Sequence, residues 1–151
     1  MILHRISTKK YARDLSGTGS KLYGGRWNPK GSAMLYTAEH KSLSALELLA
    51  HIDKSSIPDD LEMISIEVPD DCVLEFPITL FKSILKNENS KSKFREEGKN
   101  WLISDKSLGL KVPSVVIPSE KNVLLNPSHK LFSKIKIVKV ESFYYDERLF
   151  K

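Results

Sequence analysis

The sequence is poor in cysteine, and this scarcity excludes several classes of site. Cys72 is the only cysteine among 151 residues, so the chain forms no intrachain disulfide and no metal centre built on several thiolates. Of the four histidines, only His40 and His51 lie close together in sequence. A spacing of eleven residues places them about three turns apart on a helix. That is too far apart to bind one ion, so we expect no metal site.

Long apolar runs are also absent. The longest covers only a few residues, far below the roughly 20 that cross a bilayer, and the segment after Met1 lacks the pattern of a secretory signal. Hydrophobic residues make up 40% and charged residues 28% of the chain, which are ordinary proportions for a folded globular protein. We therefore expect a soluble, cytoplasmic protein with one domain over residues 1–151 and no membrane partner.

Several motifs of common enzymes and binding proteins are missing. No Walker-type loop, GxGxxG, GxSxG or HExxH occurs, which disfavours kinases, simple NTPases, α/β-hydrolases and zincins. The net charge of +5 would suit a phosphate backbone. No RNA-binding sheet motif or helix-turn-helix signature accompanies this charge. Direct nucleic-acid binding is therefore disfavoured, and the basic surface equally suits an acidic protein or an anionic nucleotide.

Hydrophobic patterning predicts a mixed set of elements. Alternation and β-branched runs favour strands, and apolar residues spaced by three and four favour helices. The polar stretch 85–100 reads as solvated surface without a chemical role. Strands are expected at 2–6, 34–37, 61–68, 112–117, 122–127 and 135–140, with 73–76 as a further candidate, and helices at 42–52, 93–103 and 128–134. Because these elements do not follow a strict βαβ order, they predict an α+β domain with a mixed sheet.

Residues 24–47 hold the densest group of candidate functional residues. Gly24 and Gly25 allow close approach of the backbone to a ligand, and the guanidinium of Arg26 presents a planar fork of donors for phosphate or carboxylate. The alternative is a structural arginine that stacks on the indole of Trp27 and fixes the loop. Tyr36 ends an apolar strand, where an aromatic side chain commonly belongs to the core, but its position also suits stacking on a flat ring.

Glu47 stands on the predicted helix 42–52, which is apolar on most of its circumference and is therefore expected to be buried on several sides. Ser44, Glu47 and His51 are spaced by three and four residues, so they form one narrow polar stripe. A carboxylate there suits a cleft, where it stabilises positive charge or holds a hydroxyl group. The alternative is a capping box with Ser44 as N-cap, although Ser42 would give a helix of more ordinary length.

Two further polar residues lie in or beside predicted strands. Alternation places Ser114 on the same face as Val112 and Val116, which is expected to be the core side, so its hydroxyl needs a partner or a ligand. Asn122 and Asn126 flank a short apolar run. They are candidates for turns, and Asn122 is also a candidate ligand contact.

Four ordered segments together resemble a known family. GGRWNPKG, MLYTAEHKSLSALELLAH, VPSVVIPSEKNVLLNPSHKLF and FYYDERL are similar to the RES domain, which is named for its arginine, glutamate and serine. The resemblance runs from Arg5 to Arg148, nearly the whole chain. It places Arg26, Glu47 and Ser114 at the three naming positions of the family.

The resemblance implies a toxin of a bacterial toxin–antitoxin pair, with a fold similar to ADP-ribosyltransferases and with NAD as its substrate. Some members of the family degrade NAD by phosphorolysis or hydrolysis, and others transfer ADP-ribose to a protein acceptor. The partner is an Xre-like DNA-binding antitoxin that plugs the active site. We therefore expect an NAD-consuming toxin. The alternatives are a protein ADP-ribosyltransferase and a basic binding module without catalysis.

The chemistry of NAD cleavage fits these residues. Breaking the nicotinamide–ribose bond passes through an oxocarbenium-like state, which a carboxylate stabilises. By the resemblance, Glu47 takes this role and Arg26 anchors the pyrophosphate or ribose. Tyr36 would stack near nicotinamide, while Ser114 would help to orient the nicotinamide–ribose end. Because NAD carries its own leaving group, the reaction requires no metal.

Overall fold

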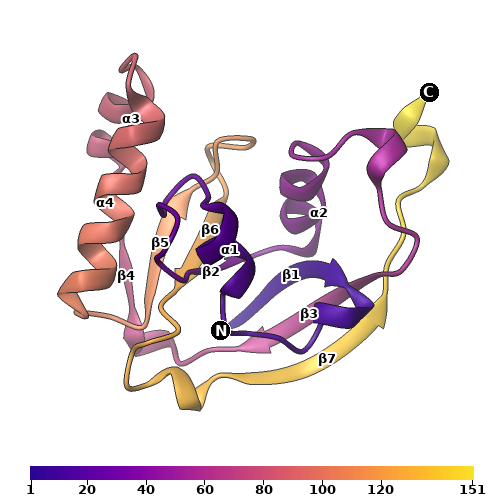
Figure 1. Cartoon of the computed structure of the whole chain (residues 1–151), viewed down its shortest axis with the longest axis horizontal. Helices are drawn as coiled ribbons and strands as arrows, with labels where there is room; N and C mark the ends of the chain where they lie inside the picture. Colours follow the sequence, from indigo (N-terminus) through magenta and orange to yellow (C-terminus); the bar gives the residue numbers. More distant parts are fainter.

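A seven-stranded mixed sheet forms the framework of the computed structural model, which describes residues 1–151 (Figure 1). The strands lie in the order β4-β5-β6-β2-β1-β3-β7. Neighbouring strands run antiparallel except β4 and β5, which are parallel. Their bounds are β1 Ile2–Thr8, β2 Leu35–Ala38, β3 Leu61–Glu67, β4 Val73–Glu75, β5 Gly109–Pro113, β6 Lys121–Leu125 and β7 Lys136–Ser142. The predicted α+β class with a mixed sheet is confirmed.

Four α-helices accompany the sheet. Figure 1 shows α3 and α4 side by side next to β4 and β5, while α2 stands apart over β1 and β2. None of the helices has the length and apolar character that a membrane crossing requires. The helices are α1 Thr18–Tyr23, α2 Lys41–Leu49, α3 Ile78–Leu85 and α4 Ser90–Ser104, and the 3₁₀ turns are η1 Lys9–Tyr11, η2 Lys54–Ser56, η3 Asp70–Cys72, η4 Phe132–Lys134 and η5 Glu147–Phe150.

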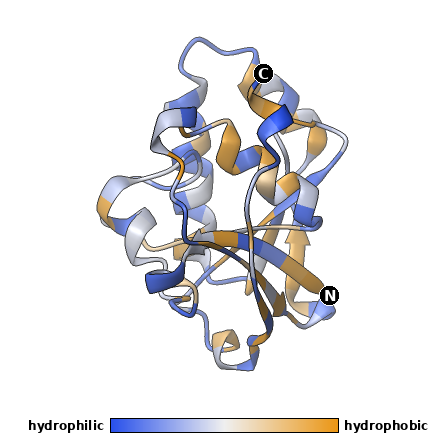
Figure 2. Ribbon diagram, turned by 90° about the vertical axis from the view of Figure 1, so that its right-hand side faces the viewer, coloured by the Kyte–Doolittle hydropathy of each residue, from blue (hydrophilic) through white to orange (hydrophobic).

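Most of the buried apolar residues form two clusters of ten. One packs strand residues such as Leu3, Ile64 and Leu125, in keeping with the hydrophobic colour along the strands in Figure 2. The other contains an aromatic cluster, here defined as Trp27, Phe76, Phe81 and Phe94. The ring of Trp27 lies 4.8 Å from that of Phe94 and 5.0 Å from that of Phe76. Aromatic pairs at these separations add to the stability that burial provides.

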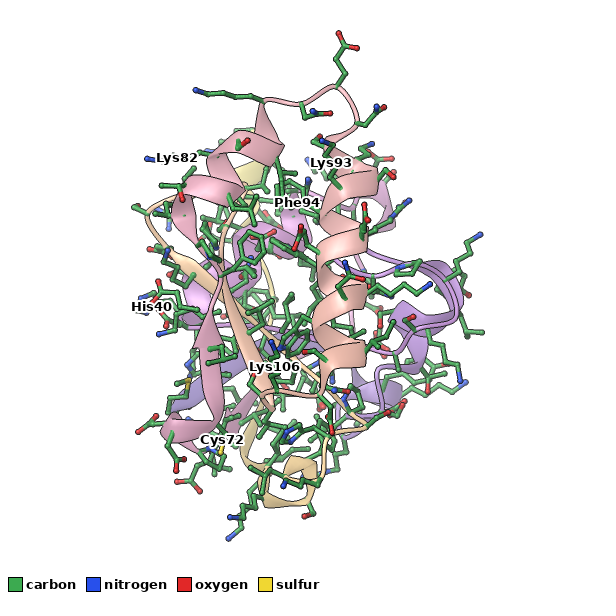
Figure 3. The ribbon with its side chains drawn as sticks, turned by 90° about the vertical axis from the view of Figure 1, so that its left-hand side faces the viewer. His40, Cys72, Lys82, Lys93, Phe94 and Lys106 are labelled. Carbon is green, nitrogen blue, oxygen red and sulfur yellow. The ribbon has the colours of Figure 1, made fainter.

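The polar stretch 85–100 differs in part from the expectation. The helix expected at 93–103 is present and begins earlier, since α4 runs from Ser90 to Ser104 and buries Phe94, Gly98 and Trp101. These three positions are spaced by four and three, so they form one helix face among many charged residues. Figure 3 shows Phe94 pointing from α4 into the interior. The expectation of a solvated surface overlooked this sparse apolar face, and α3 before it was not predicted at all.

Other helix and strand boundaries also differ from those expected from the sequence. The strand expected at 112–117 ends at Pro113, because the chain turns at Ser114, and Val116 is 40% exposed rather than in the core. The helix expected at 128–134 is reduced to the turn Phe132–Lys134. Helix α2 is not buried on several sides, since only Leu43 and Ser44 are buried. Its apolar circumference is therefore partly open to solvent.

Candidate functional site

The candidate site lies where strands β1 and β2 part from one another. These strands pair at one position, His4 opposite Ala38, whereas β1 pairs with β3 and β2 pairs with β6 along their whole lengths. Beyond the His4–Ala38 pair, the C-terminal half of β1 and the N-terminal half of β2 separate. The separation opens a cleft between two well-supported strands.

Backbone hydrogen bonds determine which groups face this cleft. Lys9 donates its backbone N–H to the segment that enters β3. In this register the odd-numbered residues of β1 therefore direct their N–H and C=O groups toward β3. The backbone N–H of Glu39 likewise donates to β6, so the odd-numbered residues of β2 direct their N–H and C=O groups toward β6. Because antiparallel strands alternate the direction of their backbone groups, Ile6 and Tyr36 turn their N–H and C=O groups toward the cleft.

A cavity of about 780 Å³ occupies this region. Its volume is in the range of small-molecule and cofactor sites. The lining comes from β1, the segment after it, α1, the Gly24–Trp27 loop, β2, α2, β5 and β6. Of the five residues proposed from the sequence, Arg26, Tyr36, Glu47 and Asn122 line the cavity. Ser114 does not line it and is fully buried behind Glu47.

The carboxylate of Glu47 is held by two side chains, Ser114 from the turn after β5 and Asn122 from β6. Its Oε1 accepts hydrogen bonds from the Ser114 hydroxyl at 2.7 Å and from the Asn122 amide at 2.5 Å. The other oxygen, Oε2, has no protein partner, and it is not among the buried unpartnered atoms. One carboxylate oxygen is thus fixed while the other remains available to a ligand.

Local geometry directs the Ser114 hydroxyl toward Glu47. Its Oγ accepts hydrogen bonds from the N–H groups of Val116 and Ile117, both at 3.0 Å. Since a hydroxyl has two acceptor lone pairs and one proton, the proton is left for Glu47. The sequence correctly indicated a buried serine that needs a partner, and that partner is Glu47.

The capping-box alternative for Glu47 is wrong. The N-cap of α2 is His40, and Ser44 lies inside the helix rather than at its start. The Glu47 carboxylate reaches Ser114 and Asn122. It therefore faces the cleft.

The stacking alternative for Arg26 is also wrong. Trp27 packs its ring inside the aromatic cluster against Phe76 and Phe94, and no cation–π contact joins it to Arg26. Arg26 is half-buried, lines the cavity, and makes no side-chain hydrogen bond or ion pair with the protein. All five N–H donors of its guanidinium are therefore free for an anion.

Tyr36 fixes the loop that carries Arg26. Its hydroxyl donates to Oδ1 of Asn28 at 2.6 Å and accepts from the N–H of Trp27 at 3.0 Å. Burial raises the pKa of Tyr36 to about 12. A Cβ on Gly25 would come within 2.6 Å of this hydroxyl, so the loop requires glycine there. The ring still lines the cavity, and stacking on nicotinamide stays a prediction.

Two contributors were missed from the sequence. Asn28 is fully buried, and its amide donates to the C=O groups of Ser20 and Ser32, both at 2.9 Å, so it organises the loop from within. Arg5 lines the cavity and donates to the C=O of Asp14 at 3.1 Å, and burial lowers the pKa of its guanidinium. A charged residue within the apolar strand ILHRI was the available signal for Arg5.

Comparison with known proteins gives the site a family context. The model of the RES domain matches residues 2–146. The chain belongs to the RES-domain family. It is 39% identical over 151 residues to "Toxin Res" of Yersinia enterocolitica, covering 99% of both chains. It is 34% identical over 143 residues to the "Prs ADP-ribosylating toxin" of a Sphingobium species, covering 93% of this chain and 89% of the relative.

A solved structure shares the fold of this RES-domain chain. A chain in the crystal structure of the M. tuberculosis MbcT–MbcA toxin–antitoxin complex superposes with a TM-score of 0.76. The match covers 94% of this chain and 83% of that chain, at 16% sequence identity. At this level of identity the similarity concerns the fold.

Proposed function

We propose that this RES-domain protein is the toxin of a toxin–antitoxin pair and that it consumes NAD by cleaving the nicotinamide–ribose bond. The observation that carries the proposal is the Glu47 carboxylate. Ser114 and Asn122 hold its Oε1, while Oε2 remains available beside a cavity that also contains the unpaired Arg26. The names of the curated relatives, which call them toxins, support the biological role.

The proposed reaction breaks the bond between C1′ of the ribose and the pyridinium nitrogen. The bonding electrons pass to that nitrogen, so nicotinamide leaves as a neutral molecule and positive charge develops on the ribose. Oε2 of Glu47 accepts a hydrogen bond from a ribose hydroxyl, and the carboxylate stabilises the developing charge. Water or phosphate then forms the new bond to C1′ through oxygen and releases a proton.

The remainder of the cavity suits the rest of NAD. The free guanidinium of Arg26 matches a pyrophosphate oxygen pair, and Arg5 supplies a second positive charge to the cavity wall. The backbone N–H and C=O groups of Ile6 and Tyr36 complement the carboxamide of nicotinamide, which has both donors and an acceptor. Ser114 acts in this scheme by orienting Glu47 rather than by contacting NAD.

Transfer of ADP-ribose to a protein is the second candidate. The name of the Sphingobium relative, at 34% identity, favours this outcome. The same cleavage step would apply, with a nucleophilic side chain of the acceptor in place of water or phosphate. An Xre-like antitoxin is the proposed partner that restrains either activity, in line with the fold shared with a chain of a toxin–antitoxin complex.

The purified protein incubated with NAD tests the proposal. We expect nicotinamide to be released, and three parallel reactions show what accepts the ADP-ribose group. Acceleration by phosphate together with ADP-ribose 1″-phosphate as product indicates phosphorolysis, free ADP-ribose indicates hydrolysis, and label from adenylate-labelled NAD on a protein indicates transfer. If no nicotinamide appears with water, phosphate or a bacterial protein extract as acceptor, the proposal is wrong.

A further inference from the structure

The helix that carries Glu47 has little packing of its own. Only Leu43 and Ser44 are buried in α2, and Leu46 is 38% exposed. Yet Glu47 must keep Oε1 within hydrogen-bond distance of Ser114 and Asn122, which belong to a different part of the sheet. Contacts beyond the burial of Leu43 must therefore help to hold α2 in position.

The end of β7 and the C-terminal segment after it meet α2 and the chain after α2 at three points. Near the start of the helix, Lys41 forms an ion pair of 2.6 Å with Glu141. In the middle, the hydroxyl of Tyr145 donates to the backbone C=O of Ala45. Beyond the helix, the ammonium group of Lys54 lies 5.4 Å from the ring centre of Phe150. Figure 1 shows the C-terminal end of the chain beside the segment that follows α2.

The middle contact is the best defined of the three. The ion pair of Lys41 is partly exposed, and such pairs contribute little to stability. The ring of Tyr145 instead packs edge-on against Phe143 at 5.0 Å and against Phe150 at 6.0 Å. The N–H of Phe143 donates to the C=O of Leu61, which ties the segment to β3. These contacts thus hold the Tyr145 hydroxyl in position against the backbone of α2 at Ala45.

The charge state of Tyr145 suits a donor. Burial raises the pKa of its hydroxyl to about 12, so the group keeps its proton at physiological pH. Ala45 lies two residues before Glu47, in the same helical turn. A hydrogen bond at this carbonyl therefore restrains the part of α2 from which the carboxylate extends.

We propose that Tyr145 is a positioning residue for NAD cleavage, which holds the Glu47 turn of α2 through its bond to Ala45. This inference rests on the proposed function. Tyr145 is not among the residues that line the cavity, so it acts through Glu47 and not on NAD. Loss of its hydroxyl moves the carboxylate relative to Ser114 and Asn122, and small displacements of a catalytic group reduce turnover strongly.

The test is the kinetics of nicotinamide release by Tyr145→Phe in the full-length protein. We expect kcat to fall about tenfold, with KM for NAD within twofold of the wild-type value. Tyr144→Phe is the matched control, because Tyr144 is 83% exposed and makes no side-chain hydrogen bond. This neighbouring variant should keep the wild-type kcat. A kcat for Tyr145→Phe within twofold of wild type, or a change confined to KM, overturns the inference.

A double-mutant cycle with Ser114→Ala separates positioning from general loosening of the fold. If both residues act by orienting Glu47, the fall in kcat of the double variant is smaller than the product of the two single effects. Multiplicative effects contradict the inference. Should Tyr145→Phe melt below the assay temperature, Phe143→Leu keeps the hydroxyl but loosens the ring packing, and an unchanged kcat in that variant overturns the inference. A wild-type protein that releases no nicotinamide would refute the proposed function itself.

Discussion

The loop that carries Arg26 and the helix that carries Glu47 face the same cavity, but different forces hold them. Trp27 anchors the Arg26 loop in the aromatic cluster, and the buried Asn28 and the partly buried Tyr36 hold the loop by hydrogen bonds. Helix α2 has two buried residues and depends on directed hydrogen bonds. Substitutions that loosen the loop should therefore mainly lower stability, whereas those around α2 should mainly lower activity.

Gly98→Ala should give the largest loss of stability. A Cβ at Gly98 would lie 1.8 Å from the carbonyl oxygen of Trp27, so α4 could no longer pack against the Arg26 loop. We expect the free energy of unfolding to fall by about 3 kcal/mol, as measured by urea denaturation. Gly19→Ala is the control, since a Cβ there meets nothing within 4 Å. Equal stability of the two variants would show that α4 does not support the loop.

Tyr36→Phe should give the second-largest loss of stability, because it leaves the N–H of Trp27 and Oδ1 of Asn28 without their hydrogen-bond partner. A loss of about 2 kcal/mol is expected, with weaker NAD binding as the Arg26 loop relaxes. Burial raises the pKa of Tyr36 to about 12, so its neutral form is favoured in the fold. The contribution of the Tyr36 hydroxyl to folding stability is complete below the unfolded-state pKa of about 10. It is lost as the pH rises through 12.

The pH dependence gives this prediction an independent check. Wild-type stability measured by denaturation should decline between pH 10 and pH 12 more steeply than that of Tyr36→Phe. Identical slopes for the two proteins would mean that the tyrosine hydroxyl does not contribute as its hydrogen bonds indicate.

Ser114→Ala should have the smallest effect on stability, about 1 kcal/mol, because the chain after it is partly exposed. Its effect on turnover should be clear, with a fall in kcat of about tenfold, since Oε1 of Glu47 loses one of two donors. Ser119→Ala, on the exposed turn nearby, is the control. A Ser114→Ala variant that loses stability but keeps the wild-type kcat would show that Ser114 has a structural role and does not orient Glu47.

Sequence reasoning found most of the candidate residues because their signals are local. Glu47 stands on a narrow polar stripe of a helix, and Arg26 follows two glycines. The interpretation of Ser114 was partly right: its burial was expected, but β5 ends at Pro113 and the residue lies in a turn. The helix expected at 93–103 is α4, but its first turns were interpreted as solvated surface, because Phe94, Gly98 and Trp101 are the only buried residues of α4.

The cleft itself could not be read from the sequence. It exists because β1 and β2 pair at His4 and Ala38 and then separate, and such pairing depends on contacts between distant segments. The same holds for the bond from Tyr145 to Ala45, which joins residues 100 positions apart. Local patterns predict elements and polar side chains, whereas the arrangement of strands and of the C-terminal segment depends on tertiary packing.

The rate of nicotinamide release by Glu47→Gln tests the central claim most directly. Glutamine keeps the shape of the side chain and removes its negative charge, so stabilisation of the developing ribose cation should be lost. We predict a fall of at least about 100-fold in kcat, with the melting temperature within a few degrees of wild type, while Glu67→Gln on the exposed part of β3 retains full activity. A folded Glu47→Gln protein that releases nicotinamide at the wild-type rate would contradict the account.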